Sequence, residues 1–232
     1  MTPILELRGV RAAYGQIEVV HGVDLVVEHG TVVAILGPNG AGKSTTLKVC
    51  AGLMAPTGGE LLLAGRRVNG ASADELARAG LCLIPEGKGI FPNLTVRENL
   101  LMATHTGRAL REIEAVAYAR FPRLGERRKQ LAGTMSGGEQ QMLAMARGLT
   151  TNPALLLLDE LSMGLAPIIV EELYGVVAQV ASEGVSILVV EQFAQTVLGV
   201  ADVAAIMVHG RIEKVGAPDS LAEELSSAYL GG

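Results

Sequence analysis

The chain has 232 residues, of which 49% are hydrophobic, 19% are charged and 29 are glycine, and its formal net charge is −5. This length fits one large domain, and so apolar a chain with so few charges is not disordered. The net negative charge argues against a general nucleic-acid binder. No apolar stretch approaches the roughly 18–20 residues that a membrane-spanning helix needs, so we expect any membrane role to depend on a partner.

Neither a disulfide framework nor a zinc site is expected. Cys50 and Cys82 are the two cysteines; they lack the CxxC spacing and have apolar neighbours, so we expect two buried free thiols. The four histidines are scattered along the sequence, at none of the spacings typical of metal ligands. Other residue types must therefore supply the chemistry.

In the first third of the chain, apolar alternation and glycine-containing turns predict mostly strands. The run TVVAIL at 31–36 is apolar and β-branched almost throughout, as expected of a strand buried on both faces of a parallel sheet. The other predictions here are strands at 4–10, 19–27, 60–63 and 81–84, a helix at 43–51, and a helix that begins at Ser72 and stops at Gly80.

The middle of the chain changes to a helical pattern, with helices predicted at 99–121 and 125–131 and a loop at 133 that becomes a helix to 146. Alternation of strands and helices then resumes, which implies an α/β fold with a mostly parallel sheet. We therefore expect a core of residues 1–86 and 148–232, with a helical subdomain inserted at 87–147. The later predictions are strands at 154–158, 185–190, 203–208 and 211–215, and helices at 168–182, 193–198 and 218–230.

Residues 37–44, GPNGAGKS, match the pattern GxxxxGK[ST] between a predicted buried strand and a predicted helix. The glycines let backbone N–H groups surround phosphate oxygens, and the helix N-terminus adds partial positive charge. Lys43 is expected to reach the β- and γ-phosphates, and the Ser44 hydroxyl to bind Mg²⁺. The predicted ATP-binding residues of this loop are Gly37, Pro38, Asn39, Gly40, Ala41, Gly42, Lys43, Ser44 and Thr45.

The apolar run at 155–158 ends in two carboxylates, Asp159 and Glu160. We expect Asp159 to hold Mg²⁺, directly or through water, and Glu160 to accept the proton of an attacking water. The prediction places this strand end on a neighbour of the strand that leads to Lys43 and Ser44. The alternative is that the two carboxylates only cap the following helix.

A second glycine-containing segment, SGGE at 136–139, precedes a predicted helix, a position suited to an anion. A chain with one complete phosphate loop has little need of another. We therefore expect this segment to serve the nucleotide of a second copy. The residues predicted to bind ATP in trans are Ser136, Gly137, Gly138 and Glu139.

Taken together, the loop at 37–44, SGGEQ at 136–140 and LLLLDE at 155–160 resemble the ATP-binding subunit of ABC transporters in order and spacing. The resemblance covers the whole chain. It implies an ATPase with a P-loop NTPase core, an N-terminal antiparallel β part, and head-to-tail dimers that hold ATP and Mg²⁺. It also implies two integral membrane permease subunits as partners and a peripheral position on the cytoplasmic face of the membrane.

The resemblance extends to single positions. Tyr14 matches the aromatic residue that stacks on adenine in the family, and is counted with the ATP-binding residues. Glu86 stands where the family usually has a glutamine near Mg²⁺, and Gln192 where most members have a histidine at the γ-phosphate. The resemblance thus implies Glu86 as a third residue of the Mg²⁺ site, and Gln192 as catalytic together with Glu160 and Lys43. Either substitution can lower basal hydrolysis, because a carboxylate adds negative charge and a glutamine cannot become a cation.

Within the family, the chain resembles the second ATPase subunit of branched-chain amino-acid importers. The resemblance lies in PEG at 85–87, GLAP at 164–167, EQ at 191–192 and the C-terminal AYLGG, whereas Leu161 departs from the usual proline. It implies a sister ATPase subunit, with a homodimer still open, and indirectly an extracytoplasmic solute-binding protein. The alternatives are importers of amides, urea or other amino acids, a soluble ABC ATPase of a non-membrane complex, and a nucleotide switch with little turnover.

The loop at 87–100 carries three apolar residues, Ile90, Phe91 and Leu94. They either pack the helical subdomain or face a partner. In the resembled family this region receives a coupling helix of the membrane subunit.

Overall fold

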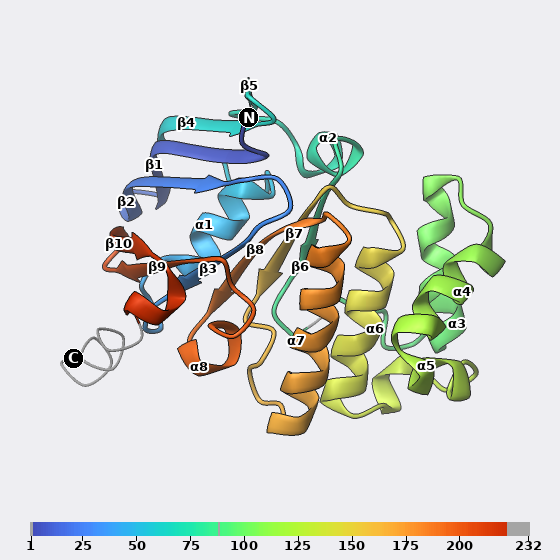
Figure 1. The fold of residues 1–232 in the computed structure, drawn as a ribbon. Helices are drawn as coiled ribbons and strands as arrows, with labels where there is room; N and C mark the ends of the chain where they lie inside the picture. Colours follow the sequence, from blue (N-terminus) through green and yellow to red (C-terminus); the bar gives the residue numbers. More distant parts are fainter. Residues whose placement is uncertain (1, 88, 222–232) are drawn as a thin grey trace.

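The computed structural model describes residues 2–87 and 89–221, and every structural statement below refers to these ranges. Figure 1 shows two sheets with helices between and beside them. No helix in this part of the chain is both long enough and apolar enough to cross a membrane.

The N-terminal sheet is antiparallel, as predicted, and its strand order is β2-β1-β4-β5. Its first strand extends four residues beyond the predicted end at Val10, so that Tyr14 is its last residue. Alternate residues of this strand, Leu5, Leu7, Val10 and Ala12, are buried. The strands are β1 Leu5–Tyr14, β2 Ile17–Val27, β4 Gly58–Leu63 and β5 Arg66–Arg67.

The second sheet has the order β10-β9-β3-β8-β7-β6, with parallel pairing throughout except at the edge strand β10. This confirms the mostly parallel sheet. It also corrects one expectation: β8 lies between β3 and β7, so the strand that leads to Lys43 is not the neighbour of the strand that ends in Asp159. The strands are β3 Val32–Leu36, β6 Leu81–Ile84, β7 Leu155–Asp159, β8 Ser186–Glu191, β9 Val203–Val208 and β10 Arg211–Gly216.

Two hydrophobic cores cover the two faces of this parallel sheet. Val33 and Ile35 face the core that α1 (Lys43–Cys50) and the antiparallel sheet complete. Ala34 and Leu36 face the other core, with α6 (Gly137–Leu149) and α7 (Pro167–Ser182). Burial on both faces is the reason why β3, β7 and β8 are apolar except at Asp159, Ser186 and Glu191, which lie at strand ends.

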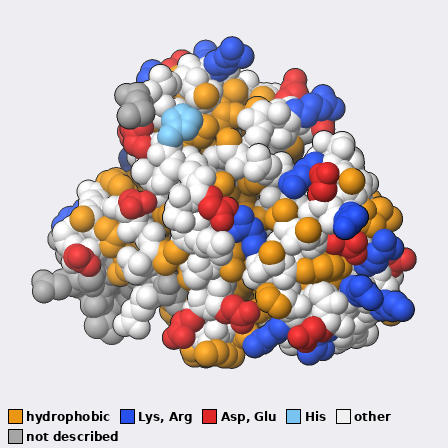
Figure 2. Space-filling view, turned by 45° about the vertical axis from the view of Figure 1, so that its right-hand side comes forward, with side chains coloured by type: hydrophobic (Ala, Val, Ile, Leu, Met, Phe, Trp, Pro, Cys, Tyr) orange, Lys and Arg blue, Asp and Glu red, His pale blue; other side chains and the backbone are white. Residues whose placement is uncertain are grey.

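The remaining helices include α3, α4 and α5, which lie on the far side of α6 from the parallel sheet (Figure 1). Acidic, basic and apolar side chains are interspersed on the face that Figure 2 shows. The helices are α2 Ala73–Arg78, α3 Val96–Leu101, α4 Leu110–Arg120, α5 Pro122–Glu126 and α8 Ala194–Val197, with 3₁₀ segments at Met102–Thr106 and Ala132–Thr134.

Two helix predictions in the middle of the chain are wrong. The helix expected at 99–121 is broken by the 3₁₀ segment and by Gly107, whose φ of 85° ends that segment in the left-handed region. The segment 127–131, expected to be helical, instead pairs with residues 94–97 through backbone hydrogen bonds such as Val96 N–H to Gln130 O. The predicted C-terminal helix is helical at 218–221, and its continuation to 230 lies outside the described residues.

Candidate functional site

The phosphate loop joins the buried strand β3 to α1, as the sequence predicts. Gly42 is the N-cap of α1 with a φ of 103°, and no side chain caps this helix end. At Gly37 a Cβ atom would stand 2.1 Å from the carbonyl oxygen of Met207, so only glycine fits there. The N-terminus of α1 is therefore free to bind an anion.

Lys43 is 3% exposed, and its ammonium group folds back over the loop. Its Nζ donates to the carbonyl oxygens of Gly37 and Pro38, at 2.9 and 3.2 Å. The same Nζ lies 3.4 Å from Oε1 of Glu160. The structure thus brings together the two residues predicted to act on the γ-phosphate, from two strand ends that are separated by β8.

Ser44 and Asp159 meet directly, although 115 positions separate them in the sequence. The Ser44 hydroxyl donates to Oδ1 of Asp159 at 2.8 Å. Burial raises the pKa of Asp159, and the Glu160 carboxylate raises it further, while the hydrogen bond from Ser44 lowers it. The two hard oxygen donors predicted to bind Mg²⁺ are therefore adjacent.

Glu160 begins the turn that follows β7. Its φ of 46° lies in the left-handed region, and its N–H donates to the carbonyl oxygen of Val190 on β8 at 3.0 Å. Its side chain is 8% exposed. A non-glycine residue held at positive φ carries local strain, which is often found at functional sites.

One cavity of about 370 Å³ holds most of the predicted groups. Glu86 reaches it from the end of β6, and Glu160 from the end of β7. Of the residues predicted for the phosphate loop, the Mg²⁺ site and catalysis, five are not part of its wall: Gly37, Pro38, Ala41, Asp159 and Gln192. Asp159 nevertheless accepts a hydrogen bond from Ser44, which does line the cavity. The lining residues are Val19, Asn39, Gly40, Gly42, Lys43, Ser44, Thr45, Glu86, Glu160 and Met163.

Tyr14 lies at the end of β1, beside α1, and is 47% exposed. Lys48 Nζ donates to its hydroxyl at 3.3 Å and lies 5.9 Å from the ring centroid. Hydrogen bonds with Thr45, the largest effect, and with Lys48 lower the pKa of Tyr14. Its ring is therefore exposed next to the last residue of the phosphate loop, outside the cavity wall.

The segment at 136–139 does not meet the phosphate loop of its own chain. Ser136 is the N-cap of α6: its hydroxyl accepts from Glu139 N–H, and Glu139 accepts from Ser136 N–H. Arg127 Nε lies 2.8 Å from Glu139 Oε1. At Gly138 a Cβ would stand 2.6 Å from Ile169 Cγ2, so glycine allows α6 and α7 to pack closely. Of the four residues predicted to act in trans, Gly137 lines a second cavity of about 180 Å³, next to Glu86 and Glu160.

Glu191 is not among the predicted site residues and entered the resemblance only as part of the EQ pair. It ends β8, is 1% exposed and accepts hydrogen bonds from Ser162 and Tyr174. Burial raises its pKa. The pattern that could have identified Glu191 is a carboxylate at the end of an apolar strand, the same pattern that identified Asp159. Gln192, the next residue, is half-buried.

Of the three apolar residues in the loop at 87–100, Ile90 packs against the core and Leu94 is half-buried, whereas Phe91 is 42% exposed. The guanidinium of Arg147 lies 4.6 Å from the centre of the Phe91 ring. Both cysteines are free: Cys50 is buried, Cys82 is half-buried, and burial raises their pKa values to about 12 and 11.

Comparison with known proteins agrees with this geometry. The family described as ABC transporter matches residues 20–162. The chain is 41% identical to the high-affinity branched-chain amino acid transport ATP-binding protein BraG of Pseudomonas aeruginosa, over 99% of this chain and 100% of that protein. It is 34% identical to a probable branched-chain amino acid transport ATP-binding protein, LivF, of Archaeoglobus fulgidus, over 92% of each chain.

Solved structures share the fold. The structure of an ATP-binding subunit of an ABC transporter has a TM-score of 0.84 and 28% identity, and covers 98% of both chains. An ATP-binding cassette of an ABC transporter in its ADP conformation has a TM-score of 0.87 at 24% identity, over the whole of both chains. With Lys43, Ser44 and Glu160 on one cavity and Asp159 bonded to Ser44, the chain belongs to the ABC transporter family and is an ATP-binding cassette, the ATPase unit of that family.

Proposed function

We propose that the chain is the ATP-hydrolysing subunit of an importer of branched-chain amino acids. The observation that carries the proposal is the 41% identity with BraG, which spans essentially the full length of both chains. The similarity to LivF of Archaeoglobus fulgidus, a probable branched-chain amino acid transport ATP-binding protein, supports the same substrate class. The cavity at the phosphate loop supplies the chemistry.

ATP binds with its phosphates against the N-terminus of α1. The phosphates become the partners of Lys43 Nζ, which now donates to two carbonyl oxygens of the loop. The exposed ring of Tyr14 stacks on the adenine, because it lies beside Thr45 at the end of the same loop. The backbone N–H groups at 39–44 hold the phosphate oxygens.

The oxygen donors at the cavity fit Mg²⁺, which prefers hydroxyl, carboxylate and phosphate oxygens. Ser44 and Asp159, with oxygens 2.8 Å apart, would hold the ion, and Glu86 lies on the wall of the same cavity. When bound, the ion would neutralise part of the negative charge on the β- and γ-phosphates. Glu86 brings a further carboxylate close to those phosphates, which predicts a slow basal rate.

Hydrolysis uses Glu160 as the general base. Its carboxylate accepts a proton from the attacking water, and Lys43, 3.4 Å away, stabilises the charge on the γ-phosphate. Gln192 follows the end of β8 and serves as a hydrogen-bond donor to the phosphate, without changing its charge.

A second cassette completes the site. The four residues predicted to act in trans do not line the nucleotide cavity of their own chain, so we infer that they contact ATP held by a partner in a head-to-tail dimer. They are Ser136, Gly137, Gly138 and Glu139. The partner is a sister ATPase subunit or a second copy of this chain. The dimer assignment explains why one chain presents two helix N-termini suited to phosphate.

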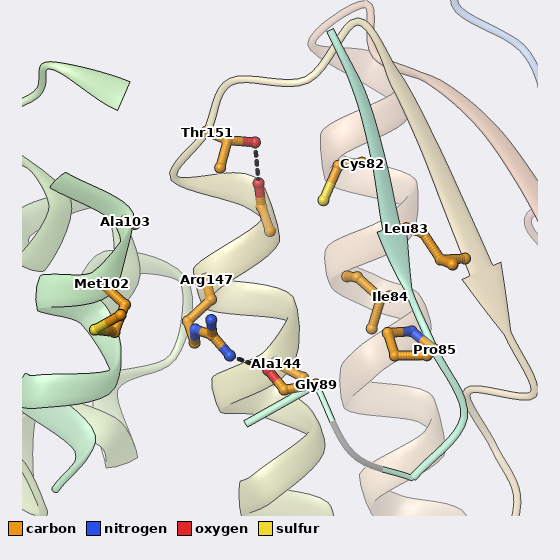
Figure 3. A pocket seen from close by; sticks show the side chains of 11 residues that line it. Cys82, Leu83, Ile84, Pro85, Gly89, Met102, Ala103, Ala144, Arg147 and Thr151 are labelled. Carbon is orange, nitrogen blue, oxygen red and sulfur yellow. Dashed lines mark hydrogen bonds between the residues drawn. The ribbon is translucent and has the colours of Figure 1, made fainter. Parts of the chain in front are cut away.

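We assign the permease contact to a groove between the core, 1–86 and 148–232, and the helical subdomain, 87–147. Figure 3 shows this groove, about 170 Å³ in volume, with Cys82 and Ile84 of β6 on one side and Met102 on the other. Leu101 and Met102 are 45% and 47% exposed beside it. The groove would contact a short helix of one integral membrane subunit, and the second cassette of the dimer would contact the other. This would place the cassette peripherally on the cytoplasmic face of the membrane.

The test of the catalytic assignment is Glu160→Gln in the purified protein. We expect ATP binding to persist and phosphate release to fall by about 100-fold or more. The control is Glu183→Gln, which changes a surface glutamate that pairs with Arg120 and does not line the cavity. Wild-type phosphate release from Glu160→Gln would contradict the assignment, and negligible release from the wild type would favour the nucleotide switch.

The test of the transport assignment is purification of the tagged chain from its native membranes, with mass spectrometry of the partners. Two permease subunits, a sister ATPase and a solute-binding protein that binds Leu, Ile and Val are the expected result. A binding protein selective for amides, urea or other amino acids would change the substrate. Recovery with a soluble complex would contradict an importer.

A further inference from the structure

Glu191 takes no part in the steps described above, yet it is almost completely buried. Its Oε1 accepts from Ser162 N–H at 2.9 Å and from the Tyr174 hydroxyl at 2.7 Å. Its Oε2 accepts from the Ser162 hydroxyl at 2.8 Å. One carboxylate thus joins the end of β8, the turn after β7 and helix α7.

The turn after β7 is the segment that carries Glu160 into the nucleotide cavity. Glu160 has a positive φ, and Met163 also lines that cavity. Within the turn, Met163 N–H donates to Glu160 O at 3.3 Å, and Leu165 N–H donates to Ser162 O at 3.2 Å. Because the first residue is strained, contacts from outside the turn must hold it in place. Glu191 supplies two of them, both at Ser162.

Burying a carboxylate has an unfavourable desolvation free energy. Removing its charge from water is unfavourable unless several hydrogen bonds compensate, and an apolar side chain of similar volume is often at least as stable. The retention of a charge that makes three hydrogen bonds to the turn and to α7 therefore indicates a requirement for geometry rather than for packing alone.

We propose that Glu191 is a positioning residue for ATP hydrolysis: it fixes Ser162 and thereby the direction in which Glu160 points into the cavity. The inference rests on the proposed role of Glu160 as the base. Tyr174 orients the carboxylate from α7, so that the turn is held relative to the helix that packs against α6.

The experiment compares kcat and KM for ATP in four single variants of the full chain. Glu191→Ala removes all three hydrogen bonds, and we expect kcat to fall by about tenfold or more with KM within twofold. Glu191→Gln is the conservative variant: its amide oxygen can accept from Ser162 N–H and Tyr174, and its NH₂ group can donate to the Ser162 hydroxyl. We expect it to keep kcat within about threefold of the wild type.

Ser162→Ala and Tyr174→Phe each remove one of the three bonds, and we expect an intermediate fall in kcat for the serine variant and a smaller one for the tyrosine variant. The double variant Glu191→Ala/Ser162→Ala should be no slower than Glu191→Ala alone, because both changes release the same turn. A purely structural role would lower thermal stability, and the kcat losses of the two single variants would then add up in the double variant.

Three results would overturn the proposal: a wild-type kcat in Glu191→Ala, a loss in Glu191→Gln as large as in Glu191→Ala, or additive losses in the double variant. Should Glu191→Ala not fold, an unchanged kcat in Ser162→Ala would overturn it as well. Glu160→Gln distinguishes a failure of the proposed base from a failure of the positioning role of Glu191. If that variant hydrolyses ATP normally, the proposed base is wrong; if it is inactive while the Glu191 variants are normal, only the positioning role fails.

Discussion

The two helix N-termini that the sequence marks for phosphate differ in how their backbone N–H groups are satisfied. Helix α1 begins at Gly42, with no side-chain cap and no acidic residue in its first turn. Helix α6 begins at Ser136, which forms a reciprocal capping box with Glu139, and Arg127 in turn pairs with Glu139. The first end is open, and the second is closed by its own side chains.

A helix N-terminus alone therefore does not define a phosphate site. The open end of α1 faces a cavity with Lys43, Ser44 and Glu160, and no side-chain cap has to be displaced there, although Lys43 must exchange its two carbonyl partners for a phosphate. At α6, Ser136 already accepts one N–H through its side chain, and Glu139 adds negative charge. A nucleotide held by a partner must therefore be recognised mainly by the donors that this capping box leaves free.

The largest loss of phosphate release is expected for a substitution at the open N-terminus of α1. Lys43→Met keeps the length of the side chain and removes the charge that the phosphates meet, so phosphate release should fall by about 100-fold or more. ATP affinity, measured with a fluorescent analogue, should fall in parallel. The control is Lys129→Met, which removes an exposed lysine that does not line the cavity. If Lys129→Met is equally inactive, the loss does not belong to Lys43.

The capping box at α6 is compared with the one at α2, where Ser72 and Glu75 form the same pattern far from the cavity. Ser136→Ala and Ser72→Ala should each lower the free energy of unfolding by about 1 kcal/mol, because each loses a cap. Only Ser136→Ala should also lower phosphate release of the assembled dimer, by about tenfold. Chemical denaturation and steady-state assays test both. Equal activity in the two variants would contradict a trans role for Ser136.

At the open end, the raised pKa of Asp159 predicts a dependence of stability on pH. A carboxyl group whose pKa is raised in the folded state stabilises the fold below its ordinary pKa, and this contribution is lost as pH rises through the raised value. Asp159→Asn buries no charge and can still accept from Ser44. We expect a gain in Tm of about 2 to 4 °C at pH 7, the size that ~1 kcal/mol produces in such a domain.

The gain should vanish below pH ~3.9, the ordinary pKa of an aspartate, where the wild-type carboxyl is also neutral. Thermal unfolding of the nucleotide-free protein over this range is the measurement. A gain that is independent of pH would show that packing, and not the buried charge, is responsible. The variant should at the same time lose hydrolysis, since the carboxylate is assigned to Mg²⁺.

The smallest effect is expected at Arg127, which is largely exposed at the closed end. Arg127→Gln breaks its ion pair with Glu139 and should lower the free energy of unfolding by about 0.5 kcal/mol. Phosphate release should change by less than twofold, because the capping box does not depend on Arg127. The control is Arg123→Gln, which breaks a longer pair with Glu172 at 3.9 Å. A loss of activity as large as that of Ser136→Ala would show that Arg127 holds the closed end in place.

Local residue patterns were enough for much of the fold and site. The continuous apolar runs of β3, β7 and β8 predicted a parallel sheet buried on both faces, and GPNGAGKS between β3 and α1 predicted the phosphate loop. The break in the helix expected at 99–121 was not predictable from periodicity. Segment 127–131 left the helical pattern because residues 94–97 offered backbone partners, which is a tertiary effect.

Local sequence was sufficient to predict the open helix end, because Gly42 begins α1 and Lys43 contacts Gly37 and Pro38, all within a few positions of one another. Three features depend on how the elements pack: β8 lies between β3 and β7, Ser44 meets Asp159, and Ser136 stays apart from the cavity of its own chain. So does the contact between Glu191 and Ser162, 29 positions apart. Strand order and packing fix such contacts, and no local periodicity encodes them.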